Sequence, residues 1–272
     1  MPIDNKMRKI FLFLAIALYI FTGKASAQEK LSVDTLECHI VGFNFGCMMP
    51  GSILSSEGGM HSLYKAPFLN FGVDAFYKYL DGWLVSLDGN IFFGNDNLKD
   101  RMTRMSDVYT RDSIIVGTNG TDAVVTCYNR GIAVNAGVGR ILKTSDSNPN
   151  SGILLQLKAG FIQNQTIFML NEVNAPQVDG DYAYLYDHQR RGFALTEGVG
   201  YWFMSNRLNL VNCYVSLQVT QSWTHSTRQY VIDDLLGLRG PDNNKYFDLI
   251  YTLKVAWMFP LKGKTAYDYY YF

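Results

Sequence analysis

The chain has 272 residues and a formal net charge of zero, with 24 basic and 24 acidic side chains. A neutral chain lacks the basic surface that contacts a phosphate backbone, so these values argue against a nucleic-acid-binding role. Aromatic residues make up 14% of the chain and charged residues only 18%, below the ~25% of charged residues in soluble domains, which indicates that something other than water surrounds much of the protein.

The N-terminal segment, residues 1–27, has the organisation of a secretory signal peptide. Three basic side chains lie within the first nine residues, 10–21 is an apolar run, and Ala25-Ser26-Ala27 matches the A-x-A cleavage pattern. The apolar run is shorter than the ~20 residues of a membrane-spanning helix, and no later stretch is long enough for one. We therefore expect residues 1–27 to be cleaved and the mature chain to be exported.

Eight segments of the mature chain alternate between apolar residues and polar or small residues with a period of two. They cover about residues 39–48, 68–79, 83–93, 131–142, 152–164, 192–203, 210–223 and 247–259. Such alternation indicates strands with lipid on one face and a polar interior on the other. The sequence therefore predicts an all-β fold over residues 28–261, a transmembrane antiparallel up-and-down β-barrel of eight strands.

The lengths of the connections support this topology independently. Long gaps at about 49–66, 95–129, 166–190 and 225–244 alternate with short ones at 80–82, 144–151 and 205–207. Outer-membrane barrels have short periplasmic turns and longer outer loops. We therefore expect four longer extracellular loops and short periplasmic turns between the strands.

Six charged residues fall on the inward parity, three of each sign. They are Asp74, Lys78, Asp88, Lys158, Asp248 and Lys254. The interior of an eight-stranded barrel is just wide enough for side chains to fill it, which argues against a general pore. We expect these residues to form a buried network of ion pairs, and a proton or ion path is the open alternative.

Two features on the outside suggest contacts with a partner. Glu197 shares the outward parity of its segment, so either a partner covers it or a bulge shifts the register there. Pro260 is expected to stop strand pairing, and 262–272 follows as an aromatic periplasmic tail that contains Tyr267, Tyr269, Tyr270, Tyr271 and Phe272. This tail is either an interfacial anchor or a peptide that docks on a partner.

The four cysteines, Cys38, Cys47, Cys127 and Cys213, have no zinc-site spacing. In an oxidising compartment Cys127 and Cys213 are separated enough to join different elements by a disulfide. Thiols that act as small apolar side chains are the alternative. No cofactor is expected.

Candidate catalytic residues lie in the long loops and at the outer strand ends. They are His61-Ser62, His188, His225-Ser226, Asp233 and Asp234. The pair His225-Ser226 resembles the outer-membrane lipid A deacylases of the PagL type, in which His is the base and Ser the nucleophile. That family has His and Ser two residues apart, whereas here they are adjacent, and neighbours on a strand point to opposite faces.

The whole mature region resembles the small outer-membrane barrels of Bacteroidota, including the PorT-type secretion proteins, and the barrels of the OmpA type. The resemblance rests on the signal segment, on Gly- and Tyr-rich strands such as 198–203 and on the aromatic tail. It implies an accessory role in secretion, barrel assembly or surface-lipoprotein export.

The leading hypothesis is therefore a non-enzymatic scaffold or accessory subunit of an outer-membrane complex, in contact with membrane lipids, lipopolysaccharide and other protein subunits. One rival is a lipid-modifying enzyme that uses His225 and Ser226. The other is a surface adhesin or ligand-binding barrel that works through the loop from Asn95 to Asn129.

Overall fold

The computed structural model describes residues 37–51, 67–95, 114–145, 148, 150–171, 175–179, 182, 188–204, 212–227 and 245–261. The strands are β1 (Cys38–Pro50), β2 (Phe68–Lys78), β3 (Trp83–Asn95), β4 (Ile115–Val116), β5 (Asp122–Lys143), β6 (Gly152–Asn171), β7 (His188–Met204), β8 (Asn212–Ser226) and β9 (Lys245–Leu261), with one short 3₁₀ turn, η2 (Pro176–Val178). Within the described residues, no helix is long and apolar enough to cross a membrane.

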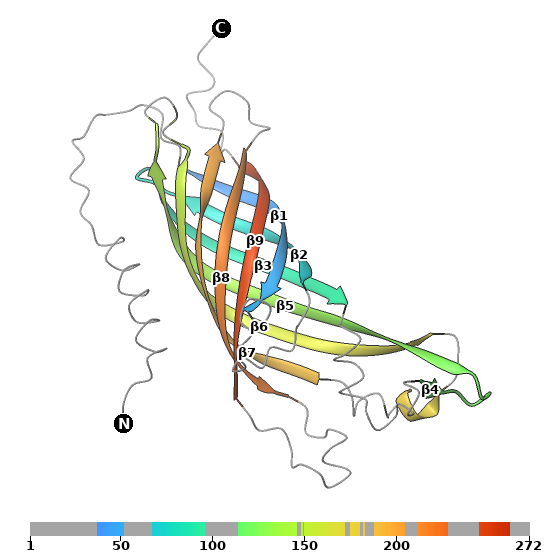
Figure 1. The fold of residues 1–272 in the computed structure, drawn as a ribbon. Coiled ribbons are helices and arrows are strands. Elements are labelled where there is room, and N and C mark those ends of the chain that lie inside the picture. The colour runs from blue at the N-terminus through green and yellow to red at the C-terminus, as the bar shows by residue number, and fades with distance from the viewer. Residues whose placement is uncertain are drawn as a thin grey trace, which may run out of the picture. The chain divides into compact units, whose positions relative to one another are not determined.

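Eight of these strands close into an antiparallel barrel (Figure 1). Strands pair with their neighbours along the chain, β3 pairs with β5, and β9 pairs back with β1 to complete the ring. The short strand β4 pairs only with β5 and is not a member of the ring. The prediction of an eight-stranded up-and-down barrel is therefore confirmed.

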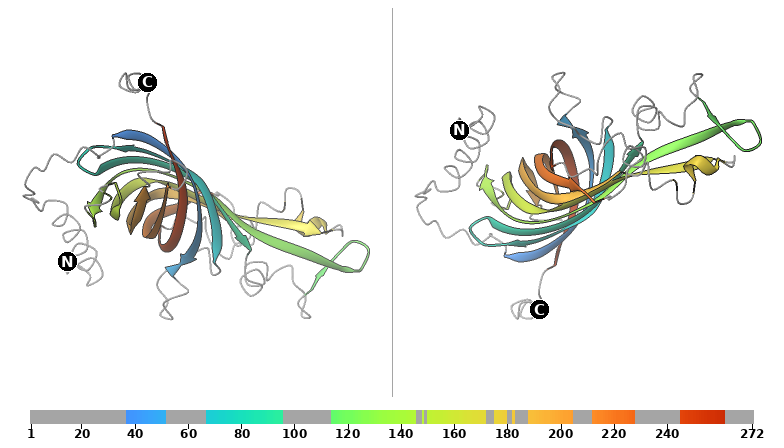
Figure 2. Two further views of the ribbon diagram at one scale, coloured as in Figure 1. Left: turned by 90° about the horizontal axis from the view of Figure 1, so that it is seen from above. Right: turned by 90° about the horizontal axis from the view of Figure 1, so that it is seen from below.

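Strands β5 and β6 are longer than the sequence pattern predicts. Their pairing continues to Val124 opposite Asn171, although the predicted segments stop near 131 and 164. Strand β3 ends at Asn95, which faces Tyr128, so β5 has no barrel neighbour before residue 128. Strand β7 pairs with β6 only as far as His188 opposite Thr166, so β6 has no barrel neighbour after residue 166. Beyond these points the two strands run out to one side of the ring as a two-stranded ribbon, which we call the β5–β6 extension (Figure 2).

The expectation that Pro260 stops strand pairing is wrong. Strand β9 continues to Leu261, with Pro260 opposite Ile40 of β1. On its other side β9 pairs with β8 only as far as Trp257 opposite Cys213. Proline lacks an N–H and is tolerated where a strand has a neighbour on one side only, so it fits here without ending the strand.

The connections divide between the two ends of the barrel as expected. The strand ends that are joined by the long connections, 51–67, 96–121, 172–187 and 227–244, lie at one end of the barrel. The strand ends joined by the short ones, 79–82, 144–151 and 205–211, lie at the other. We call the end with the long connections the outer end and the end with the short ones the inner end.

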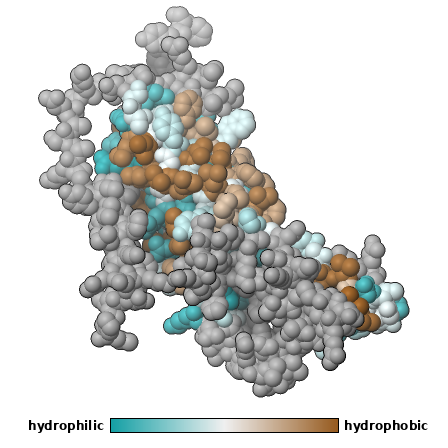
Figure 3. Space-filling model, viewed as in Figure 1, coloured by the Kyte–Doolittle hydropathy of each residue, from teal (hydrophilic) through white to brown (hydrophobic). Residues whose placement is uncertain are grey.

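The distribution of polarity is the reverse of that in a soluble protein. Along β9, Leu253, Val255 and Trp257 are 44–56% exposed on the outer wall, whereas Lys254 and Ala256 between them are 1% exposed in the lumen. Exposed apolar side chains occur on every strand of the ring, and on the face drawn in Figure 3 they form a band across the wall. An apolar outer band with a polar interior is typical of a transmembrane barrel.

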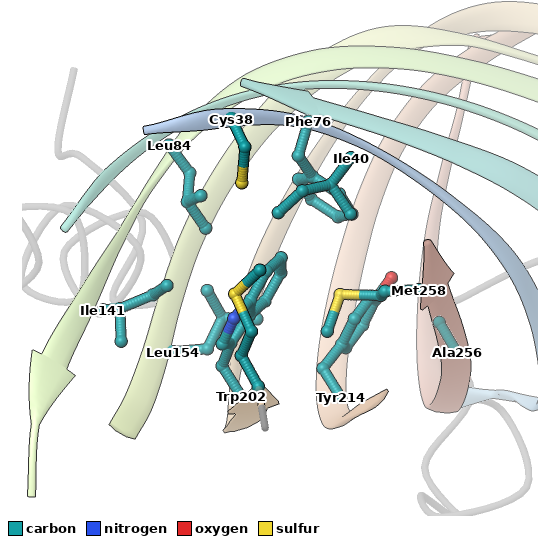
Figure 4. Packing of buried hydrophobic residues seen from close by; sticks show 11 residues of the cluster. Cys38, Ile40, Phe76, Leu84, Ile141, Leu154, Trp202, Tyr214, Ala256 and Met258 are labelled. Carbon is teal, nitrogen blue, oxygen red and sulfur yellow. The ribbon is translucent and has the colours of Figure 1, made fainter. Parts of the chain in front are cut away.

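The lumen is filled in three layers. An inner-end cluster consists of Cys38, Ile40, Phe76, Leu84, Ile141, Leu154, Trp202, Met204, Tyr214, Ala256 and Met258 (Figure 4). An outer-end cluster consists of Met48, Phe68, Phe92, Ala133, Ile162, Ala194 and Ile250. Buried polar and charged residues occupy the layer between the two apolar clusters. Strand β8 contributes only to the inner-end cluster, and its inward residues from Ser216 to Thr224 are all polar.

Gly82, in a turn at the inner end, has a backbone conformation and a close contact that both favour glycine. Gly82 has φ +84°, its carbonyl accepts a hydrogen bond of 2.8 Å from the N–H of Ile141, and an added Cβ would lie 2.8 Å from the Ile141 carbonyl oxygen. We expect Gly82→Ala to lower the free energy of unfolding by about 2–3 kcal/mol, through strain and a clash. Gly120 has φ +76° and nothing within 4 Å of an added Cβ, so Gly120→Ala should cost about 1 kcal/mol. Urea unfolding measures the free energy of unfolding of both variants. Equal losses in the two would show that the clash with Ile141 adds nothing at Gly82.

Candidate functional site

Two ion pairs lie in the middle layer of the lumen. The Nζ of Lys254 is 2.8 Å from Oδ1 of Asp74, and the Nζ of Lys158 is 2.7 Å from Oδ1 of Asp88. The four side chains are at most 3% exposed. Because Asp74 and Asp88 face each other across β2 and β3, the two pairs lie side by side. We call these four residues the charge cluster.

Each carboxylate of the charge cluster also accepts hydrogen bonds from neutral groups. The hydroxyl of Tyr214 donates to Oδ2 of Asp74 at 2.6 Å. The side-chain amides of Asn90 and Asn135 donate to Oδ2 of Asp88 at 2.6 and 3.0 Å. Buried charges are tolerated only when they are paired and hydrogen-bonded, and the charge cluster meets both conditions with its own residues.

The other two predicted network residues lie apart from the charge cluster. Lys78, near the inner end, donates to Oδ1 of Asn150 at 3.0 Å. Asp248, near the outer end, accepts a hydrogen bond from the hydroxyl of Thr224 at 3.3 Å. The structure thus brings together four of the six inward charges and separates the remaining two along the barrel axis.

Little space remains beside the charge cluster. A cavity of about 30 Å³ lies between the charge cluster and the outer-end cluster, with Asp88, Lys158, Asn135 and Phe92 in its wall. This volume holds about one water molecule. In the described part of the lumen, the side chains therefore leave no passage of the size that a diffusion pore needs, and the geometry favours a structural plug.

The inner-end cluster was not predicted from the sequence. Trp202 and Tyr214 are fully buried and stack with their ring centroids 5.8 Å apart at 5°. Phe76 contacts both rings edge-on, at 5.2 and 5.8 Å, and Figure 4 shows these side chains meeting inside the ring of strands. The signal for this cluster was present in the sequence, because all three aromatics lie on the inward parity near the inner strand ends.

Glu197 lies on the outer wall, halfway along β7 between Phe193 and Tyr201, both of which face outward. Strand β7 pairs with both neighbours without interruption at this point, and Glu197 faces Leu157 on β6 and Val219 on β8. The alternative of a bulge that shifts the register is therefore wrong. Its carboxylate oxygen Oε1 is buried and has no hydrogen-bond partner among the described residues.

A second polar residue lies beside Glu197 on the same wall. Gln221 shares the outward parity of Leu217 and Trp223, and it faces Leu195, two residues from Glu197. Gln221 is 7% exposed, and within the described part of the chain its oxygen Oε1 also lacks a hydrogen-bond partner. We call Glu197 and Gln221 the polar wall pair, because they place two unsatisfied acceptors in an otherwise apolar surface.

The candidate catalytic pair is not brought together. His225 is exposed on the outer face of β8 opposite Arg191, whereas Ser226 follows the inward parity opposite the buried Arg190. A base and a nucleophile on opposite faces of one strand do not share a substrate. Among the described residues, no three His, Cys, Asp or Glu side chains gather as metal ligands.

Several predicted residues cannot be placed. His61, Ser62, Asp233, Asp234, the signal segment 1–27 and the tail 262–272 lie outside the described residues, as does the side chain of His188 at the start of β7. The proposed disulfide between Cys127 and Cys213 is not formed, because Cys213 forms no disulfide. Cys38 and Cys47 form none either.

The chain is similar to known proteins only at the level of solved structures. No family model matches the chain, and none of the curated proteins matches it. The solved structures that match include the attachment invasion locus protein Ail of Yersinia pestis, in complex with the heparin analogue sucrose octasulfate, at 9% identity over 82% of this chain and 100% of that chain, with a TM-score of 0.42.

Two further matches are equally distant. Neisserial surface protein A is 12% identical over 82% of this chain and 97% of its own, with a TM-score of 0.36. The outer membrane protein AlkL, solved in DMPC bilayers, is 11% identical over 89% and 99%, with a TM-score of 0.34. Likeness at this level carries no conclusion about function, and affiliation with the Bacteroidota barrels stays a prediction.

Proposed function

We propose that this chain is an integral outer-membrane barrel without enzymatic activity that acts as a scaffold or accessory subunit of a larger outer-membrane complex. The observation that carries the proposal is the polar wall pair. The filled lumen supports it, because a plugged barrel must act through its surface. The separation of His225 and Ser226 supports the absence of lipid-modifying chemistry.

The polar wall pair is costly on a wall that faces only lipid. Glu197 lies at the middle of the apolar band, where an Arg or Lys costs ~2–4 kcal/mol and a carboxylate costs less but is still unfavourable. Two buried oxygens without hydrogen-bond partners, on Glu197 and Gln221, add to this cost. A partner with hydrogen-bond donors on its own wall would satisfy both acceptors, and the surrounding Leu and Val side chains offer it an apolar rim.

A second candidate function, a surface adhesin or ligand-binding barrel, is favoured by the β5–β6 extension. From Tyr128, the last residue of β5 that pairs with β3, to Asp122 the strand continues for roughly 20 Å beyond the barrel wall at ~3.3 Å per residue. Two residues of the extension, Ala123 and Val125, are buried on one face, and Ile115 of β4, which is also buried, faces Ala123. The other face of the extension presents Val124 at 59% and Met169 at 44% exposure, and these two apolar side chains are accessible to a binding partner.

The test is to extract the tagged full-length protein from native outer membranes in mild detergent and to measure the mass and composition of what co-purifies. We expect a stoichiometric complex with the wild-type chain and its loss with Glu197→Leu, since leucine removes the acceptor that the partner satisfies. The variant Glu197→Gln keeps an acceptor at the same position and should retain the complex at least in part. Gel mobility without heating checks that each barrel is folded.

The variant Val124→Asp separates the two candidates. It changes the exposed face of the β5–β6 extension and leaves the wall intact, so an accessory subunit held at the wall should keep its complex. A complex lost with Val124→Asp and kept with Glu197→Leu would support the second candidate instead. If the wild-type barrel is extracted without any co-purifying protein, the accessory role is contradicted.

A further inference from the structure

On four adjacent strands the outer wall changes from apolar to polar along a single line near the outer end. Cross-strand pairing aligns Phe161 of β6, Phe193 of β7, Trp223 of β8 and Phe247 of β9 in one row of outward side chains, the aromatic row. Two residues further toward the outer end on the same strands, pairing aligns Gln163, Arg191, His225 and Lys245. We call the last three residues the cation row.

The two rows form a continuous surface. Neighbouring rings of the aromatic row are in contact, with centroids 6.0 Å apart for Phe193 and Trp223 and 5.5 Å apart for Trp223 and Phe247. Arg191, His225 and Lys245 are all exposed. Residues two apart on a strand are separated by ~7 Å and neighbouring strands by ~4.8 Å, so the cation row lies directly above the aromatic row and spans ~10 Å.

A hollow lies where the two rows meet between β8 and β9. It has a volume of about 310 Å³ and is lined by Trp223, Thr224, His225, Lys245, Tyr246 and Phe247. The hollow thus has cationic and imidazole groups on its outer side and aromatic rings on its inner side. Neither row contains an acidic side chain that would neutralise these cations.

We propose that the cation row and the aromatic row together bind a phosphorylated glycolipid of the outer leaflet. Its phosphate groups lie against Arg191, His225 and Lys245, and the first part of its acyl chains lies on the aromatic row and in the hollow. This inference rests on the outer-membrane placement proposed above and does not depend on the accessory role.

The two rows are arranged in the same order as the parts of this ligand in a membrane. The cation row, nearer the outer end, suits the phosphates, and the aromatic row below it suits the acyl chains. Arginine binds phosphate with two parallel hydrogen bonds, and lysine binds it as a point charge. Aromatic side chains concentrate at the boundary between headgroups and hydrocarbon, and basic pockets at that level bind anionic headgroups. A soluble anion would use the cations alone, so the adjoining aromatic row is what favours a lipid.

The test measures binding of three probes to the full-length barrel in detergent micelles by native mass spectrometry. The probes are diphosphoryl lipid A, the same glycolipid without phosphates and inorganic phosphate. We expect the wild-type barrel to prefer the phosphorylated glycolipid by at least about tenfold, which corresponds to one charge-assisted contact or more. The double variant Arg191→Ala/Lys245→Ala should lose this preference.

Two further variants make the result specific. Lys143→Ala removes an exposed cation at the inner end and should bind like the wild type. Trp223→Ala should weaken both glycolipids while keeping the preference for phosphate, because it changes only the aromatic row. Unheated gel mobility confirms that these surface variants are folded.

The proposal is overturned if Arg191→Ala/Lys245→Ala binds like Lys143→Ala. It is also overturned if inorganic phosphate competes at the affinity of the glycolipid and Trp223→Ala has no effect, because the site would then be a phosphate site without a lipid. Failure of the outer-membrane placement appears separately, in membrane fractionation. Failure of the accessory role appears only in co-purification and leaves the lipid preference unchanged.

Discussion

We expect Lys254→Met to lower the free energy of unfolding of the barrel by about 3–5 kcal/mol, the range for removing one partner of a buried ion pair. Lys254 is 1% exposed and Asp74 is not exposed at all. The substitution leaves a buried carboxylate whose remaining donor, among the residues that the structure describes, is the Tyr214 hydroxyl. Asp74 also faces Asp88 across β2 and β3, and without Lys254 the repulsion between the two carboxylates is less compensated. Urea unfolding in lipid vesicles, followed by tryptophan fluorescence, measures the loss.

The double variant Asp74→Asn/Lys254→Met tests whether the loss comes from the uncompensated charge. Replacing both partners with neutral groups of similar size is often close to neutral in stability, so most of the lost free energy should return. Lys143→Met makes the same chemical change at an exposed position and should shift stability by no more than about 0.5 kcal/mol. If the double variant is as unstable as the single one, packing of the Lys254 side chain, rather than its charge, holds the charge cluster.

Period-two alternation was sufficient to predict the ring of strands, because lipid on one face and a filled lumen on the other impose opposite polarity on successive residues. The pattern failed where this asymmetry ends. In the β5–β6 extension, Val124 and Val125 are consecutive apolar residues, since neither face of this two-stranded ribbon lies against the barrel lumen. The strand therefore continues where the sequence predicted a loop.

The inward charges were predicted by parity, but their partners were not. Which Lys meets which Asp depends on the tilt and register of strands far apart in the sequence, as the pairing of Lys254 with Asp74 shows. The inner-end aromatics were missed for a different reason. Inward positions were expected to be polar or small, yet Phe76, Trp202 and Tyr214 occupy this parity where the lumen is closed by apolar packing.

The features of the outer wall could also be recognised only once the register between neighbouring strands was known. In the sequence Arg191, His225 and Lys245 are separate residues at the ends of three segments, and only cross-strand pairing aligns them. Glu197 was recognised as an exception from parity alone. Its neighbour Gln221 was not, because one polar residue near the end of an apolar face resembles the beginning of a loop.

The second large effect is expected at the inner-end cluster, where Trp202→Ala should lower the free energy of unfolding by about 3–5 kcal/mol, as for other large-to-small changes of a buried aromatic. Trp202 is not exposed, stacks on Tyr214 and contacts the edge of Phe76, so alanine leaves a cavity that the rigid ring of strands cannot collapse. Trp257→Ala, on the outer wall at 56% exposure, should cost less than half as much because it creates no internal cavity. Urea unfolding in lipid vesicles compares the two.

Trp202→Phe separates packing from hydrogen bonding at the same position. The indole Nε1 of Trp202 is buried without a hydrogen-bond partner, so phenylalanine removes an unsatisfied donor while keeping a ring against Tyr214, and we expect a loss of only about 1 kcal/mol. Neither variant should conduct ions in planar bilayers, because the charge cluster and the outer-end cluster still fill the lumen beyond the cavity. A steady conductance with Trp202→Ala would mean that the inner-end cluster alone closes the barrel, and would favour an ion path through the charge cluster over a plug.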